Sequence, residues 1–157
     1  MPVCNLYDLL NAISPRQKVL GLDIGKKTIG LAIADPRTNV ASPQPVLWRK
    51  KFTPDAEHLI RLIDEQNVGG LVLGWPLNMD GTAGPRCDSV RDFAHAFLRL
   101  HDIAISFQDE RMSTQAVERN MIAADMTRAR RAVRRDSLAA VWILQSALDS
   151  LQSQPPG

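Results

Sequence analysis

Residues 19–35 read VLGLDIGKKTIGLAIAD, and this stretch decides the fold. Two apolar runs flank a turn rich in glycine and lysine. They predict strands at 19–24 and 29–34, and the first is apolar enough to be buried on both faces of a sheet. One carboxylate, Asp23, interrupts the first run. Because a carboxylate in an apolar strand is costly unless a cation or hydrogen-bond donors satisfy it, Asp23 is a candidate functional residue. The structural alternative is a hairpin in which backbone donors hold this Asp.

The turn between the two strands is suited to binding phosphate. Gly25 and Gly30 bracket Lys26, Lys27 and Thr28. Glycine lets a phosphate approach the backbone, and two ammonium groups attract it. The turn also resembles the first phosphate loop of the actin, Hsp70 and sugar-kinase superfamily. Those proteins need a second phosphate loop and an adenosine pocket on another domain, which 157 residues do not accommodate.

Length and composition indicate one compact domain. The 157 residues are enough for one well-buried core but too few for two ordinary domains. With 45% apolar and 23% charged residues the chain is not expected to be disordered, and a net charge of +2 leaves room for a local basic face. Cys4 and Cys87 are isolated, which favours a reducing cytoplasm and offers no metal-ligand spacing. With neither a membrane-length apolar run nor a signal peptide, we expect a cytoplasmic protein without a membrane partner.

The chain continues in α/β order. The predicted elements are a short helix within an N-terminal extension at 1–18, strands at 19–24, 29–34 and 40–48, a helix capped by Thr53 ahead of Pro54, a strand at 71–73, a helix over 90–98, a strand at 103–107, a helix capped by Ser113 or Thr114, and a last helix at 136–151. Pro43 and Pro45 remove backbone donors, so the third strand belongs at an edge. We therefore expect an α/β domain over 19–151, followed by a flexible tail at 152–157. Its mixed five-stranded sheet has the first strand at the centre and helices on both faces.

Acidic residues from distant stretches are expected to meet at one edge of this sheet. Ligands collect at the carboxyl ends of such strands, where Asp23, Asp109 and Glu110 lie, and Asp136 opens the last helix. Gathered carboxylates repel one another unless cations neutralise them, and hard oxygen ligands favour Mg²⁺ or Mn²⁺ over zinc. Two such ions about 4 Å apart would support phosphodiester hydrolysis. Taken singly, Asp136 also suits a helix N-cap, and Asp109 and Glu110 suit a surface ion pair with Arg111.

A basic run precedes Asp136. Its arginines are Arg128, Arg130, Arg131, Arg134 and Arg135. Such a run is usually a solvated loop or helix face, but beside a nuclease centre it would contact backbone phosphates without reading sequence. Lys26, Lys27, Asn78 and Arg111 are further candidate contacts for nucleic acid.

Over about 19–151 the chain resembles the YqgF (RuvX) family of Holliday junction resolvase-like nucleases. The resemblance rests on four motifs in order, LGLDIGKKTIGLAIAD, GWPLNMDGT at 74–82, DERMST at 109–114 and DSLAAVWILQSAL at 136–148. It implies an RNase H-like fold and a metal-dependent nuclease that matures the 5′ end of the 16S ribosomal RNA precursor. Asp23, Glu110 and Asp136 would be the catalytic and metal-binding acids, with Asp109 left open as an accessory ligand. Family members commonly place glycine and lysine ahead of the last acid, where this chain has arginines.

Several alternatives stay open at the level of sequence. The substrate is a ribosomal RNA precursor, a branched DNA junction or a short RNA, and cleavage is internal or from an end. A protein of another class, a non-catalytic RNA-binding factor for ribosome assembly, would keep the fold without the chemistry. The chain is a monomer or a homodimer, and Trp48 and Trp75 mark either an interface or a wall of the site.

Overall fold

The computed structural model describes residues 3–78, 80–109 and 128–152, and within the last segment it describes side chains from 138 to 150. The elements in chain order are α1 (Leu6–Ala12), β1 (Lys18–Ile24), β2 (Thr28–Asp35), β3 (Val40–Trp48), α2 (Phe52–Gln66), β4 (Val68–Trp75), α3 (Pro85–Leu98), β5 (Ala104–Asp109) and α5 (Arg128–Gln152). The helix predicted to start at Ser113 or Thr114 lies outside the described residues. The domain boundaries at 18/19 and 151/152 remain predictions.

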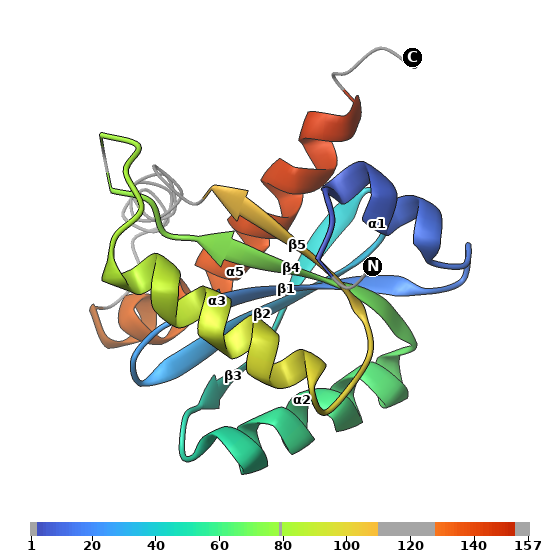
Figure 1. Cartoon of the computed structure of the whole chain (residues 1–157). Helices are drawn as coiled ribbons and strands as arrows, with labels where there is room; N and C mark the ends of the chain where they lie inside the picture. Colours follow the sequence, from blue (N-terminus) through green and yellow to red (C-terminus); the bar gives the residue numbers. More distant parts are fainter. Residues whose placement is uncertain (1–2, 79, 110–127, 153–157) are drawn as a thin grey trace.

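The five strands form one mixed sheet in the order β3-β2-β1-β4-β5 (Figure 1). β2 pairs antiparallel with β1 and with β3, whereas β4 pairs parallel with β1 and with β5. The central position of the first strand and the edge position of the strand with Pro43 and Pro45 are therefore as predicted. β4 is longer than the predicted strand at 71–73, because β1 and β5 pair with it on both sides.

Helices cover both faces of the sheet, as the sequence predicted. One core, which includes Leu20 and Leu22 of β1, lies beneath α2 and α3. The other, which includes Val19 of β1, lies beneath α5 and α1. β1 feeds both cores because successive side chains point to opposite faces of a strand. This explains why its sequence is apolar without alternation.

α5 packs closely on the middle of the sheet. A Cβ atom added at Gly21 would lie 2.9 Å from the Cβ of Leu144 and 3.3 Å from the carbonyl oxygen of Ala140. Gln145 ties the same helix to the start of β3, because its Oε1 accepts the N–H of Ala41 and its Nε2 donates to the carbonyl of Asn39, both at 2.9 Å. The glycine in β1 thus sets how near α5 lies to the sheet.

The start of α2 corrects the predicted cap. The helix begins at Phe52, so Thr53 is already its second residue. The residue at the cap position, Lys51, makes no capping hydrogen bond with its side chain. The buried Asp55 carboxylate instead reaches back and accepts the N–H of Lys50 at 3.1 Å. Thr53 was wrong as the cap because the helix already begins at Phe52, so Thr53 lies in its first turn.

The N-terminal helix lies against the sheet. Asn5 caps α1 by accepting the N–H of Asp8 at 2.8 Å, and Leu9 is fully buried over Gly70 of β4. Burying one leucine contributes about 1.5–3 kcal/mol to holding this helix against the sheet. No helix in the described part of the chain is both long and apolar enough to cross a membrane.

Candidate active site

The carboxyl ends of three parallel strands meet along one edge of the sheet. Asp23 is the last but one residue of β1, β4 ends at Trp75 and β5 ends at Asp109. The register pairs Leu22 with Leu73 and Trp75 with Asp109, so the three strands end level with one another. We call this edge the carboxyl edge. It brings the ends of these strands together as the sequence predicted.

Asp23 lies on the face of the sheet that α5 covers. Side chains alternate along β1, and Leu22 belongs to the core beneath α2 and α3, whereas Val19 belongs to the core beneath α5. Asp23 therefore shares its face with Val19 and with Gly21, on which α5 packs. The Asp23 side chain is partly buried. A carboxylate in this position points toward the α5 layer near the carboxyl edge.

Asp109 lies on the opposite face. Side chains alternate along β5, so Asp109 points to the same face as Ile105 and Phe107, which pack into the core beneath α2 and α3. The Asp109 side chain itself is exposed. Because β4 separates β1 from β5, the backbones at Asp23 and Asp109 are also about 10 Å apart. The register thus separates Asp109 from Asp23. Glu110 and Arg111 lie outside the described residues.

Asp136 and the arginines ahead of it lie in α5. The sequence predicted a last helix that begins at Asp136, but this is wrong, because α5 already starts at Arg128 and residue 136 is in the helix interior. The N-cap alternative for Asp136 is therefore also wrong. Arginine and alanine favour helix, so the basic run continues the helix instead of forming a loop. The side chains of Asp136, Arg128, Arg130, Arg131, Arg134 and Arg135 lie outside those described.

The path of α5 leads position 136 toward the carboxyl edge. Gln145 lies at the start of β3, and Leu144 and Ala140 lie over Gly21 in the middle of β1. Followed toward its N-terminus, the helix therefore runs along β1 in the direction of Asp23 (Figure 1). Position 136 is one helical turn beyond Ala140 and on the same side of the helix, since residues four apart share a side.

The exposed Lys26 and Lys27 form the tip of the β1–β2 hairpin, at the same edge. The N–H of Gly25 donates to the carbonyl of Thr28 at 2.9 Å and closes the turn. Arg49, just after β3, holds the tip from the side: its N–H donates to the carbonyl of Lys27 at 2.8 Å and its Nη1 donates to the carbonyl of Gly25 at 2.6 Å. Sequence reasoning missed Arg49, because no local pattern links it to the distant turn.

The loop between β4 and α3 is held by its own polar side chains. The amide of Asn78 donates to Oγ1 of Thr82 at 3.0 Å, and the hydroxyl of Thr82 donates to Oδ1 of Asp80 at 2.6 Å. The loop leaves β4 at the carboxyl edge. Asn78 therefore fixes the loop that would border the site, and its contact with nucleic acid stays a prediction.

The described residues include no group of three or more His, Cys, Asp or Glu side chains that could hold a metal ion. Of the predicted triad, Asp23 is the member whose side chain is described. Its carboxylate is a hard oxygen donor, and the two other predicted ligands are carboxylates as well. This donor chemistry suits Mg²⁺ or Mn²⁺.

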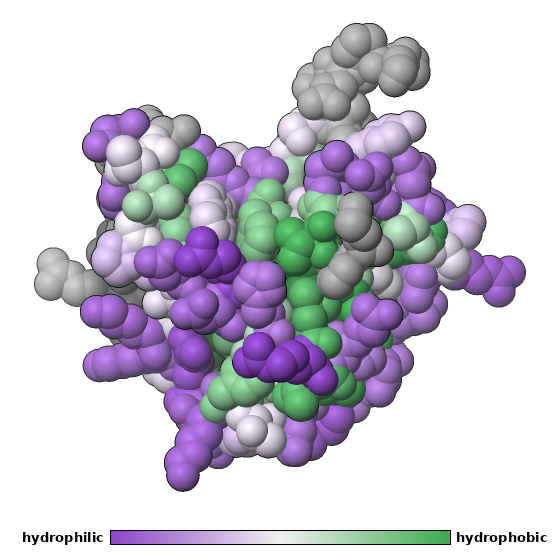
Figure 2. Space-filling model, viewed as in Figure 1, coloured by the Kyte–Doolittle hydropathy of each residue, from purple (hydrophilic) through white to green (hydrophobic). Residues whose placement is uncertain are grey.

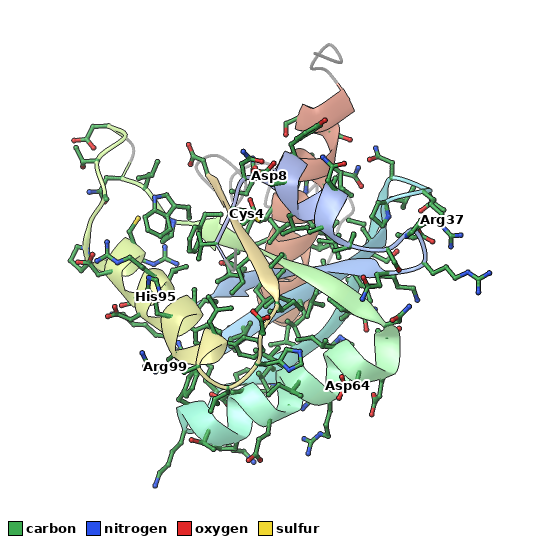
Figure 3. The ribbon with its side chains drawn as sticks, turned by 45° about the vertical axis from the view of Figure 1, so that its right-hand side comes forward. Cys4, Asp8, Arg37, Asp64, His95 and Arg99 are labelled. Carbon is green, nitrogen blue, oxygen red and sulfur yellow. The ribbon has the colours of Figure 1, made fainter. Side chains whose placement is uncertain are left out.

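A cavity of about 350 Å³ lies at the other end of the strands. Its lining includes Gln17 ahead of β1, Asp64 near the end of α2, and His101 and Asp102 ahead of β5. Figure 3 shows Asp64 on the α2 helix, well away from the hairpin tip. The cavity is therefore separate from the candidate active site.

Solved structures of low sequence identity share the fold. Thermus thermophilus RuvC, solved in complex with a Holliday junction substrate, superimposes with a TM-score of 0.54 at 11% identity, over 87% of this chain and 96% of that chain. Fowlpox virus resolvase, solved with Holliday junction DNA, superimposes with a TM-score of 0.53 at 13% identity, over 86% of this chain and 99% of that chain. These resolvases have the RNase H-like fold, so the predicted fold is confirmed.

Relatives at higher identity run along the whole chain. A protein of Paramagnetospirillum magneticum is 51% identical over 150 residues, 96% of this chain and 97% of its own. A protein of Rhodospirillum rubrum is 48% identical over 157 residues, which cover 99% of this chain and 98% of that protein. Both carry the name "Putative pre-16S rRNA nuclease". The family model named RuvX, described as Holliday junction resolvase, matches residues 17–150, and the chain therefore belongs to the RuvX (YqgF) family.

Proposed function

We propose that this chain is a metal-dependent nuclease that hydrolyses phosphodiester bonds, with the precursor of 16S ribosomal RNA as its substrate. The observation that carries the proposal is the position of Asp23, a partly buried carboxylate at the carboxyl edge on the face covered by α5. The family to which the chain belongs and the names of its relatives support the nuclease chemistry and the ribosomal substrate.

Asp23, Glu110 and Asp136 are the proposed metal ligands. Asp23 and Asp136 come from two layers that face each other, because Asp23 points toward α5 and position 136 follows Ala140 along that helix. Glu110 is the proposed third ligand in preference to Asp109, which the strand register turns to the opposite face. Bound Mg²⁺ or Mn²⁺, as a pair of ions, would supply an activated water and neutralise charge on the phosphate.

The basic side chains have a separate task in this proposal. Lys26 and Lys27 at the hairpin tip, and the arginines along the first third of α5, hold the backbone phosphates that flank the scissile bond. Such ammonium and guanidinium groups would align the polyanion across the carboxylates. We place the activity in the cytoplasm, in line with the two isolated cysteines.

The decisive variant is Asp23→Asn, with Asp109→Asn as its matched control. Each removes one carboxylate charge at the carboxyl edge with almost no change in volume, but on opposite faces of the sheet. We expect Asp23→Asn to lower cleavage at least about 100-fold, because several kcal/mol of transition-state stabilisation depend on the bound ions. Asp109→Asn should cleave nearly as the wild type does.

The assay compares labelled ribosomal RNA precursor with a labelled four-way DNA junction, each with and without Mn²⁺. Far-UV circular dichroism and thermal unfolding check that the variants are folded. Wild-type cleavage of the RNA alone supports the proposed substrate, and cleavage of the junction alone would make the protein a resolvase. Full activity of folded Asp23→Asn would contradict the proposed site. Inactivity of the wild type with all substrates would favour the non-catalytic RNA-binding factor.

A further inference from the structure

A second feature lies at the carboxyl edge, on the outer side of the β1–β2 hairpin. It consists of Trp48, whose side chain is 63% exposed, and four exposed lysines, Lys26, Lys27, Lys50 and Lys51. We call it the basic aromatic corner. The stretches that form it, 24–28 and 47–54, contain no Asp or Glu. On the near face of the molecule, hydrophilic side chains cover the lower left of Figure 2, where the hairpin tip and the start of α2 lie in Figure 1.

A register shift in β3 turns Trp48 toward the face on which Asp23 lies. At the start of β3, Ala41 pairs with Ala34, and both belong to the core beneath α5. Between the pairs Leu31–Gln44 and Ile29–Leu47, β3 contains one residue more than β2. The extra residue reverses the alternation, as bulges do.

Beyond the bulge, Leu47 packs beneath α2 and α3 opposite Ile29, and Trp48 pairs with Thr28 on the other face. Without the extra residue, Trp48 would point to the face opposite Asp23. β3 runs in the same direction as β1, since β2 is antiparallel to both, and therefore ends at the carboxyl edge. The indole and the Asp23 carboxylate thus share one face and one edge of the sheet, with β2 between them.

The backbone beneath the corner is held firmly. Arg49 bonds the carbonyls of Gly25 and Lys27, as described above, and its guanidinium carbon lies 5.8 Å from the ring centre of Phe93. The N–H of Lys50 donates to the buried Asp55 carboxylate. Arg49 therefore uses its charge within the fold. These hydrogen bonds fix the backbone that carries the lysines and Trp48.

We propose that the basic aromatic corner binds an unpaired segment of the nucleic-acid substrate, with one base stacked on Trp48 and the flanking phosphates on the lysines. This inference rests on the proposed nuclease function and adds to it a requirement for single-stranded character next to the cleaved bond. An exposed indole offers a π-face to any unpaired base, whereas the bases of a duplex are already stacked on each other. The four exposed lysines lie on stretches without acidic residues, and such a concentration of positive charge favours the closely spaced phosphates of a nucleic acid as the partner.

The test uses Trp48→Ala, Trp48→Phe and Tyr7→Ala. Tyr7, on α1, is 62% exposed and serves as a matched control for the loss of an exposed aromatic ring. All three are made in the Asp23→Asn chain and measured without divalent cations, so that binding is observed without cleavage. Fluorescence anisotropy gives the Kd for a labelled single-stranded RNA and for the same sequence as a blunt duplex.

We expect Trp48→Ala to weaken single-strand binding about 5- to 140-fold, since stacking one base contributes about 1–3 kcal/mol and 1.4 kcal/mol is tenfold. Duplex binding should change less than about twofold. Trp48→Phe should keep most of the affinity, and Tyr7→Ala all of it. Replacing Lys50 and Lys51 with Ala should lower the slope of log K against log salt by about 0.7 for each phosphate that these lysines neutralise in the wild type.

Equal weakening of single-strand and duplex binding by Trp48→Ala, or no weakening, would overturn the inference. So would a homodimer in sedimentation experiments that Trp48→Ala converts to a monomer, because the corner would then bind a second copy. Failure of the proposed nuclease function is recognised separately, by the absence of cleavage in the wild type. The binding comparison is unaffected by that result.

Discussion

Gly21→Ala tests whether the approach of α5 to β1 sets the geometry of the candidate active site. The new Cβ would lie 2.9 Å from the Cβ of Leu144 and 3.3 Å from the carbonyl oxygen of Ala140. Neither atom can move away by a change of rotamer. Ordinary contact begins at 3.4 Å, so α5 must shift by at least about 0.5 Å.

This shift has an expected magnitude in stability and in activity. Overpacking in a dense core costs about 1–3 kcal/mol, and the lower entropy of the unfolded chain with Ala offsets about 0.4–1 kcal/mol. The net loss of up to about 2.5 kcal/mol lowers Tm by up to about 10 °C. A misplacement of about 1 Å in an active site can cost about 100-fold in rate, so half that distance should lower cleavage about tenfold.

Gly70→Ala is the matched control. Its Cβ would lie 2.6 Å from Cδ2 and 2.9 Å from Cγ of Leu9, on α1, so it also overpacks a buried glycine of an interior strand. Gly70 pairs with Val19 and Ala104, at the end of the strands away from Asp23. It should destabilise the fold without a selective loss of cleavage. Both variants are assayed for cleavage at a temperature at which thermal unfolding shows them fully folded. Wild-type cleavage by a destabilised Gly21→Ala chain, or equal losses in the two variants, would refute the role given to α5.

Two further predictions concern stability. Asp55→Ala leaves the N–H of Lys50 without its buried acceptor and should lower the free energy of unfolding by about 1–3 kcal/mol, measured in urea; an unchanged midpoint would mean that water replaces the carboxylate. The side-chain hydrogen bonds from Arg37 lower the pKa of Asp35 from 3.8 to about 2, so this pair stabilises the fold above about pH 4 and loses its effect as the pH falls toward 2. Arg37→Ala, at the exposed turn seen in Figure 3, should therefore lower Tm slightly at pH 5 and by less at pH 2, where about half of the Asp35 carboxyl groups are protonated in the folded chain. An equal lowering at both pH values would contradict the ion pair as its cause.

The sequence by itself determined the main elements of the sheet and the first candidate residue. β1 and β2 are apolar without alternation because both faces of a central strand are covered, and β3 carries prolines because an edge strand can lose donors. Asp23 stands out in such a strand because burial makes an isolated carboxylate costly. These are local properties, and a local pattern records them.

Helix boundaries were less well predicted, for a physical reason. The arginine run was separated from the last helix because it breaks the apolar pattern, yet arginine is a good helix former and α5 begins at Arg128. Thr53 followed by Pro54 resembles a helix start in the local sequence. In the folded chain the helix begins at Phe52, its cap residue makes no capping hydrogen bond with its side chain, and the buried Asp55 carboxylate accepts the N–H of Lys50 ahead of the helix.

Only the tertiary structure decided which side chains share a face. Asp109 and Asp23 both lie at strand ends along the carboxyl edge, but the pairing of β4 with β5 places the exposed Asp109 on the face of the sheet that α2 and α3 cover. One extra residue in β3 turns Trp48 to the face of Asp23, and Arg49 reaches a turn far from it in sequence. Because a shift of one residue moves a side chain to the other face of a sheet, these placements depend on register between strands. Register is set by contacts between distant segments, which is why the sequence determined the candidates and the fold determined their arrangement.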